Sequence, residues 1–413
     1  MKIILAIISQ VIIGLTFIVS GIVKCIDPIG TSIKFHDYFA VLGLGWLNDW
    51  TLFLSWVLCL LEFLIGLNVL FARNLRFFAT LAGLFMLVFT PLTLYLALEN
   101  PVRDCGCFGD AIVLSNWETF WKNVVLSVCV VLLLVYRSFC YQPTRKDFAP
   151  IITYWELAIA IGLCYIGTNL LPLIDFRPYR PGVNILSAMG TESVSDEITY
   201  VCVYEKDGEK KEFPLTELPE EGSGWEFVET KELTNDGKKA TVDEPAISDF
   251  FLFDEFGGDY TETVLTDPNY TFLLVSPNLA TAEEKYLDRI ENLYEYSIEE
   301  GYNFYCVTLN DSVQVNRWKY RTGAEYEYLY SDATILETVI RANPGVVLLK
   351  EGTILWKSCL SNLDVDAIPS AKLTEQTYGE IIDDKAKTKV FWLLFLMLPP
   401  IIVYLPIEDC LSR

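Results

Sequence analysis

The chain has 413 residues, of which 52% are apolar, and it carries a formal net charge of −23 at pH 7. The apolar residues are clustered at both ends and the acidic residues lie between them, which excludes a protein that is soluble throughout. The acidic excess also disfavours nucleic acid as a partner, because phosphate binding needs Lys and Arg. We expect it to keep the middle of the chain soluble beside a bilayer.

Six apolar stretches have about the 20-residue length that a helix needs to cross a bilayer. They are residues 3–23, 51–71, 77–98, 120–135, 155–174 and 390–405. The first has no small-x-small cleavage site after it, which indicates a retained helix. The last is short and contains Pro399 and Pro400. We predict a multi-pass α-helical membrane bundle with a four-helix core over 1–150, a fifth helix over 151–175, and a C-terminal helix with a short tail over 390–413.

The orientation follows from the basic residues of the loops after the second and fourth helices. These are Arg73, Arg76, Arg137, Arg145 and Lys146. Such loops are retained in the cytoplasm. Both termini are then cytoplasmic, whereas residues 175–389 lie outside. We expect a bacterial inner (plasma) membrane, with this soluble part on the periplasmic side.

The soluble part divides in two. Residues 176–245 form a small β-rich region, in which 200–204 and 211–213 read as a hairpin. From 246 to 389 the order is a strand at 272–275, a helix at 281–300, a strand at 303–309, a helix at 333–340 and a hairpin over 345–356. This order predicts an α/β thioredoxin-like domain. The alternating tyrosines at 326, 328 and 330 indicate one face of a further strand.

Two stretches of the membrane part resemble the DoxX family of small membrane proteins. One is IIGLTFIVSGIVKCIDP, with Gly14, Ser20 and Lys24, and the other is LCLLEFLIGLNVLF, with Glu62 and Gly66. The run DCGCFGD at 104–110, followed by WETFWKN at 117–123, looks like the methylamine-utilisation MauE branch of that family. The resemblance covers about the first 140 residues and implies a role in disulfide formation or in maturation of an exported protein.

The soluble domain resembles periplasmic thioredoxin-like proteins, but it lacks their Cys-x-x-Cys. Between the strand and the helix it has Ser276, Pro277, Asn278, Leu279, Ala280 and Thr281. Without a dithiol this domain cannot exchange disulfides by the family mechanism. Pro344 stands where the fold keeps a cis-proline beside its active site. We therefore expect a redox-inactive domain that binds a partner through the groove at Pro344.

Cys105 and Cys107 are the candidate catalytic residues. Two extended residues span at most about 7 Å, whereas a disulfide needs Cα atoms roughly 4.4–6.8 Å apart. The pair can therefore close only if the chain bends, which Gly106 permits. Arg103 would stabilise a thiolate and Asp104 would oppose it. The pair is either redox-active, a structural clamp, or two ordinary thiols.

Three charged or polar positions in or near the membrane helices could support this pair. Glu62 is an intramembrane carboxyl, which by default suggests function, here a proton relay or a quinone site. The alternative is a protonated Glu bonded to a neighbouring helix. Lys24 could pair with Asp27 or an anionic group, or snorkel to the interface. Asn123 lies near the outer end of its helix.

The remaining cysteines and the single histidine limit the chemistry further. Cys306 lies in an apolar strand and is expected to be a buried, inert thiol, whereas Cys359 is expected to be exposed and could accept electrons from the Cys105–Cys107 pair. Cysteine spacing excludes a simple structural zinc site, and His36 alone excludes bis-histidine haem and a Ser-His-Asp triad. We expect no metal and no certain cofactor, with quinone possible.

These features predict a membrane-bound thiol–disulfide redox protein that exchanges disulfides with an exported partner and could pass electrons to quinone. The alternative is a non-enzymatic scaffold or maturation factor that binds a periplasmic protein. The missing Cys-x-x-Cys favours the scaffold, and the CGCFG run favours the redox protein. A transporter has less support, because the sequence shows no internal repeat.

Overall fold

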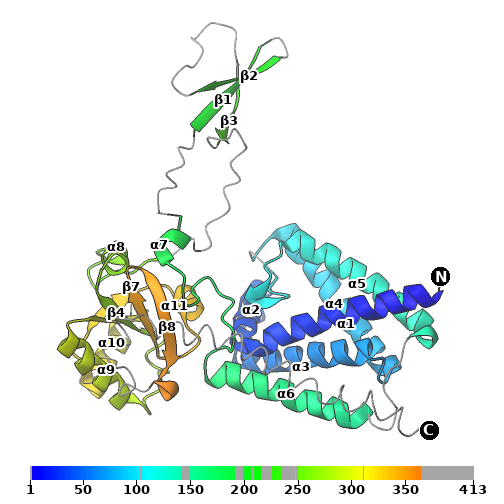
Figure 1. The fold of residues 1–413 in the computed structure, drawn as a ribbon, viewed down its shortest axis with the longest axis horizontal. Coiled ribbons are helices and arrows are strands. Elements are labelled where there is room, and N and C mark those ends of the chain that lie inside the picture. Colours follow the sequence, from blue (N-terminus) through cyan, green and yellow to red (C-terminus); the bar gives the residue numbers. More distant parts are fainter. Residues whose placement is uncertain are drawn as a thin grey trace, which may run out of the picture.

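The computed structural model describes residues 2–102, 105–140, 149–190, 199–206, 209–214, 226–233, 247, 250–309 and 311–363. These residues form a helical bundle, a small three-stranded sheet and an α/β domain (Figure 1). The α/β domain lies at the end of the bundle where α2 is found (Figure 1).

Five helices in the described ranges are long and apolar enough to cross a membrane. They are α1 (Lys2–Ile26), α3 (Thr51–Leu70), α4 (Leu75–Glu99), α5 (Asn116–Tyr136) and α6 (Ala149–Asn169). The five predicted spans from 3–23 to 155–174 are therefore confirmed, and the chain is a membrane protein. The sixth, at 390–405, falls outside the described residues.

Helices α1 and α3 pack through glycines at which no side chain fits. A Cβ atom on Gly21 would lie 2.5 Å from the backbone nitrogen of Phe63, and one on Gly66 would lie 2.5 Å from that of Ile18. Small residues allow membrane helices this close approach. The contact matters for function because Lys24 and Glu62 project from these two helices.

We expect Gly21→Ala to lower the stability of the bundle by about 1–3 kcal/mol, because the added methyl group overpacks a backbone contact. Gly162→Ala on α6 is the matched control, since no atom lies within 4 Å of a Cβ atom there. Thermal unfolding in detergent measures both. Equal melting temperatures for the two variants would contradict the packing described here.

One helix of the bundle was not predicted. No helix was predicted between the spans at 3–23 and 51–71, but residues 28–41 form α2 (Pro28–Val41). The side chain of Asp27 caps its first turn by accepting from the backbone N–H of Gly30 at 2.9 Å, and Pro28 suits the first helical position. A short 3₁₀ helix, η1 (Gly45–Trp50), then leads into α3.

The α/β domain contains a five-stranded sheet in the order β6-β5-β4-β7-β8. The strands are β4 (Tyr270–Ser276), β5 (Asn303–Thr308), β6 (Glu327–Tyr330), β7 (Gly345–Lys350) and β8 (Thr353–Cys359). β4, β5 and β6 run parallel, while β7 is antiparallel to both β4 and β8. A parallel strand–helix–strand unit continued by an antiparallel hairpin is a thioredoxin-like arrangement, as predicted.

Helices cover both faces of this sheet. α9 (Leu287–Glu300) and α10 (Ser312–Thr322) pack on one face, with Trp318 and Leu293 in the core. The short helices α7 (Ile185–Ala188), α8 (Thr261–Leu265) and α11 (Ala333–Val339) pack on the other. The central strand β4 is buried along its whole length, as expected of a strand covered on both sides.

Two details of this domain differ from the sequence prediction. α9 begins at Leu287 and not at 281, because Asn278 to Thr281 form a turn in which the Asn278 carbonyl accepts from the Thr281 N–H at 3.2 Å. α10 was not predicted, although Asp311 caps it. The prediction of a tyrosine-lined strand is confirmed, since the tyrosines at 326, 328 and 330 share one core.

The small sheet has the order β2-β1-β3 and is antiparallel throughout. Its strands are β1 (Thr199–Lys206), β2 (Glu209–Pro214) and β3 (Glu226–Leu233). The predicted hairpin of 200–204 with 211–213 is confirmed by the pairing of β1 with β2.

Candidate functional site

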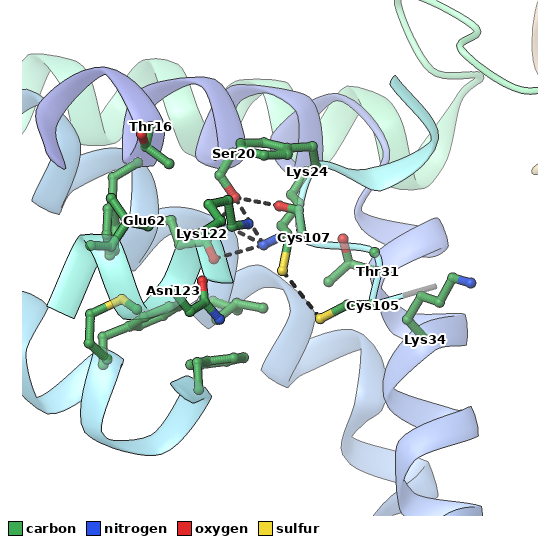
Figure 2. A pocket seen from close by; sticks show the side chains of 18 of the residues that line it. Thr16, Ser20, Lys24, Thr31, Lys34, Glu62, Cys105, Cys107, Lys122 and Asn123 are labelled. Carbon is green, nitrogen blue, oxygen red and sulfur yellow. Dashed lines mark hydrogen bonds and ion pairs between the residues drawn. The ribbon is translucent and has the colours of Figure 1, made fainter. Parts of the chain in front are cut away.

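The two sulfurs of the Cys-x-Cys run face each other. The Sγ atoms of Cys105 and Cys107 lie 3.2 Å apart (Figure 2). Gly106 makes this possible with a φ of 62°, a left-handed conformation that side chains disfavour. The predicted bend at Gly106 is therefore present, and both residues are free thiols in contact.

The backbone around the thiols is fixed by side chains from three helices. The Ser20 hydroxyl of α1 lies 2.6 Å from the Cys107 carbonyl oxygen, and the Tyr38 hydroxyl of α2 donates to the Cys105 carbonyl. Asn116, at the start of α5, donates to the Val102 carbonyl at 2.8 Å. These hydrogen bonds hold residues 105–107 at the end of the helical bundle.

A buried ion pair lies directly behind the thiols. Nζ of Lys24 lies 2.7 Å from Oε1 of Glu62, and both side chains are 5% exposed. The Ser20 hydroxyl also lies 2.7 Å from Oε2 of Glu62, so it joins the carboxylate to the Cys107 backbone (Figure 2). A single unpaired charge here would be expensive, which explains why the two occur together.

The two thiols are electrostatically unequal. The hydrogen bond with Cys105, followed by the positive charges of Lys122 and Lys24, lowers the pKa of Cys107 to about 6 despite burial. The same thiol–thiol hydrogen bond, with burial, raises the pKa of Cys105. Cys107 is also the less buried of the two. It is therefore the thiol that ionises first and meets an incoming molecule.

The reduced protein should react with iodoacetamide at Cys107 half-maximally near pH 6, not near 9. Alkylation requires the thiolate, so its rate falls as the pH drops through the lowered pKa and is level above it. Lys122→Met should move this midpoint upward, while Lys122→Arg keeps the charge and serves as the control. Peptide-resolved alkylation rates measure both, and a midpoint that ignores Lys122 contradicts the assignment.

A small cavity connects the thiols with the ion pair. It has a volume of about 60 Å³, and its lining includes Cys105, Cys107, Lys24, Glu62 and Asn123. Aromatic rings form much of the remaining wall, from Phe17, Phe35, Tyr38, Phe85 and Phe89. Asn123 is buried and donates to the Thr93 hydroxyl at 3.1 Å.

Lys24 neither pairs with Asp27 nor snorkels. It is 5% exposed and bonds Glu62, 38 positions along the chain. Its head points into the bundle because the Glu62 carboxylate lies on the facing turn of α3. Asp27 instead bonds Arg341 of the α/β domain, 314 positions away. Arg103 and Asp104 lie outside the described residues.

Sequence reasoning missed three contributors to the site, Ser20, Tyr38 and Lys122. Ser20 was named only within the stretch that resembles the DoxX family, and Tyr38 belongs to the unpredicted helix α2. Lys122 stands beside Asn123 in the WETFWKN run, and its ammonium lies 4.4 Å from the centre of the Phe108 ring. Its place one residue before Asn123 was the available signal.

The other expected thiols have mixed outcomes. Cys306 is fully buried, as predicted. The prediction that Cys359 is exposed is wrong, because it is 5% exposed and its sulfur lies 3.2 Å from the Ser361 hydroxyl. Cys359 is the last residue of β8, and the next residue, Leu360, packs into the core.

Side chains of the chain itself meet beside Pro344, where a partner-binding groove was predicted, and Pro344 does not line the cavity next to them. The Asn343–Pro344 bond is cis, as its position predicted. The side-chain oxygen of Asn343 accepts from the Ser276 hydroxyl at 2.6 Å, and its side-chain nitrogen donates to the Asn278 carbonyl at 2.8 Å. These bonds lie where other thioredoxin-like proteins carry their dithiol. In front of them is a larger cavity of about 580 Å³, bounded on its other side by α2.

Ion pairs join the α/β domain to the bundle. Nη2 of Arg341, two residues before Asn343, lies 3.0 Å from Oδ2 of Asp27 and 3.6 Å from that of Asp110, which ends the DCGCFGD run. Arg341 is 4% exposed. The α/β domain is thus held to the same loop that carries the thiols.

A second buried cluster reinforces this junction. Asp175, just after α6, accepts from Arg177 at 2.7 Å and from Lys357 of β8 at 2.9 Å. Burial raises the pKa of Asp175, but the two cations outweigh it and lower that pKa to about 2. The carboxylate is therefore charged at any ordinary pH and ties the end of the bundle to the sheet.

Comparisons with known proteins agree with parts of this picture. Residues 1–136 match the family model of the methylamine utilisation protein MauE, and residues 198–234 match a domain of unknown function, DUF8463. No curated protein matches the chain significantly. A solution structure described as a candidate protein disulfide isomerase from Bacteroides thetaiotaomicron is 16% identical, with a TM-score of 0.25, and the match covers 31% of this chain and 85% of that one. The thioredoxin-like arrangement is given by the strand order β6-β5-β4-β7-β8.

Proposed function

We propose that this protein is a membrane-bound thiol–disulfide redox protein that exchanges disulfides with an exported partner protein. The observation that carries the proposal is the pair of sulfurs 3.2 Å apart, one of them with a lowered pKa. The MauE match over residues 1–136 supports a redox-related membrane role. We place the protein in a bacterial inner membrane, with the thiols and the α/β domain on the periplasmic side.

The exchange uses both thiols in order. The Cys107 thiolate attacks a disulfide of the partner, forming a mixed disulfide and releasing one partner thiolate, which takes up a proton. The Cys105 thiol then loses its proton and attacks the Cys107 sulfur, which releases the second partner thiol and leaves a Cys105–Cys107 disulfide. Two electrons pass to the partner, and the reverse sequence oxidises it.

The α/β domain supplies binding without chemistry in this proposal. The segment from Ser276 to Thr281 has no thiol, and the cavity of about 580 Å³ beside it lies within the range of ligand pockets. Arg341 fixes this cavity relative to the loop that ends at Asp110. A partner segment held there is kept on the same end of the bundle as Cys107.

A quinone does not fit the cavity at the thiols as it stands. An apolar cavity of about 150 Å³ holds one benzene ring, whereas this one has about 60 Å³. Lys24 and Tyr38 offer suitable donors to a carbonyl, but Phe85 and Phe89, stacked with ring centres 4.2 Å apart, line the space. We therefore assign no step to quinone.

The Cys105→Ser variant should accumulate mixed disulfides between Cys107 and exported proteins, because it lacks the thiol that resolves them. The double variant Cys105→Ser/Cys107→Ser should accumulate none, and Cys140→Ser should behave like the wild type. Non-reducing electrophoresis of acid-quenched cells measures this. If the single and double variants give the same pattern, the exchange mechanism is wrong.

The alternative is a scaffold or maturation factor that binds a periplasmic protein without redox chemistry. The hydrogen bonds of the Asn343 side chain with Ser276 and Asn278 favour it, since they lie where a thioredoxin-like domain would carry its dithiol. A scaffold would support maturation of its client equally well after both Cys105 and Cys107 are replaced by serine. Loss of maturation in that double variant, with the protein still folded, argues for the redox function.

A further inference from the structure

Three other cysteines meet inside the bundle. Cys25 of α1, Cys59 of α3 and Cys164 of α6 are each 0% exposed. Each thiol lies within hydrogen-bonding reach of the other two. All three are free, and they share one apolar cluster with Phe63. We refer to them as the thiol triad.

The triad is a feature of this chain and not only of its MauE-like part. Cys25 and Cys59 lie within the residues that match the family model, 1–136, whereas Cys164 belongs to α6, which follows them. α6 approaches α1 closely here, since a Cβ atom on Gly167 would lie 2.3 Å from the Ile26 carbonyl oxygen. The added helix thus brings a third thiol to two that already face each other.

The Lys24–Glu62 ion pair lies between the triad and Cys107. Lys24 interacts electrostatically with both Cys107 and Cys59. It also precedes Cys25 directly in the sequence. Glu62 follows Cys59 by three positions on α3, which places the two on one helix face. The Lys24–Glu62 pair therefore lies between the two groups of thiols and is electrostatically coupled to both.

We propose that the thiol triad is a second redox centre, which exchanges a disulfide with the Cys105–Cys107 pair. This rests on the proposed function and deepens it by naming a thiol–disulfide exchange partner for the outer pair within the chain. The small cavity at the outer thiols leaves no room for a ring-shaped acceptor, whereas three thiols in mutual contact can hold one disulfide and keep a third thiol to resolve it.

The exchange balances without another reactant. With the outer pair oxidised, the Cys59 thiolate attacks the Cys107 sulfur and breaks the Cys105–Cys107 bond, and Cys105 leaves as a thiolate that takes up the proton lost by Cys59. Cys25 or Cys164 then attacks the Cys59 sulfur, and Cys107 is released and protonated. Two electrons and two protons move outward, and the loop of Cys107 must swing past the Lys24–Glu62 pair.

The test uses the full chain in native membranes with glutathione disulfide, a polar oxidant that reaches the outer thiols. After acid quenching, free thiols are blocked with a light maleimide, disulfides are reduced, and the new thiols are tagged with a heavy maleimide. Mass spectrometry then reads each cysteine peptide. We expect two of the three triad thiols to become oxidised in the wild type and none in Cys105→Ser/Cys107→Ser.

The outcomes separate the two proposals. An outer pair that becomes oxidised while the triad stays fully reduced overturns the second centre and leaves the proposed function intact. A triad oxidised equally in the double variant overturns the exchange between the centres. An outer pair that never oxidises removes both proposals. None of these comparisons changes a triad residue. A further variant, Cys59→Ala, should abolish oxidation of Cys25 and Cys164, and Cys129→Ala is its control.

Discussion

Lys24→Met is expected to lower the stability of the bundle by about 3–5 kcal/mol, because it leaves the Glu62 carboxyl buried without its partner. Glu62 is 4% exposed and its oxygens bond only Lys24 and Ser20 among the described contacts. The variant should also slow alkylation of Cys107, because Lys24 is one of the cations that lower its pKa. Thermal unfolding in detergent and peptide-resolved alkylation measure the two effects.

The double variant Lys24→Met/Glu62→Leu separates charge pairing from packing. Replacing a buried ion pair by apolar residues of similar volume is often neutral for stability. We therefore expect the double variant to recover most of the lost stability. It should recover only part of the alkylation rate, because it removes both Lys24, which lowers the pKa of Cys107, and Glu62, which raises that pKa. If Lys24→Met unfolds at the wild-type temperature, the ion pair does not hold the bundle together and the role assigned to it is wrong.

Arg341→Met should release the α/β domain from the bundle. The change leaves Asp27 without its counter-charge at a junction where Arg341 is 4% exposed, and breaking a buried pair costs about 3–5 kcal/mol. Hydrogen exchange should therefore rise in α2, whose first turn Asp27 caps, and in the loop that ends at Asp110. The sheet of the domain should keep its protection, since its core is independent of the junction.

Arg321→Met is the matched control for that experiment. Arg321 pairs with Glu284, but both side chains are 40% exposed, so the pair is worth about 0–1 kcal/mol. It should leave exchange in α2 unchanged. Equal exchange in α2 for the Arg341 and Arg321 variants would show that the junction is held by other contacts, such as those of Asp175.

The parts of the fold that the sequence predicted are those with local signals. Five spans follow from apolar length, and the strand and helix order of the α/β domain follows from periodicity. The bend at Gly106 follows from covalent geometry between two neighbouring cysteines. Helix α2 was missed because it is short and mixes polar with apolar residues, although Asp27 and Pro28 form a recognisable start signal.

The parts that the sequence did not predict depend on contacts between distant residues. The partner of Lys24 lies 38 positions away, and that of Asp27 lies 314 positions away. A nearby carboxylate such as Asp27 is the natural first guess for Lys24, but helix packing decides the outcome. The three cysteines of the thiol triad likewise come from three helices, and their spacing in the sequence does not predict that they meet.

The most direct test of the central claim is thiol trapping in intact membranes with a mass-tagging maleimide, reading Cys105 and Cys107 separately. The two residues should change together, from free thiols to a disulfide and back, when mild reductant is removed and supplied. Cys140, outside both groups of thiols, should not change. If Cys105 and Cys107 stay free under oxidising conditions, or form a bridge that resists reductant, the pair is structural and the scaffold function takes its place.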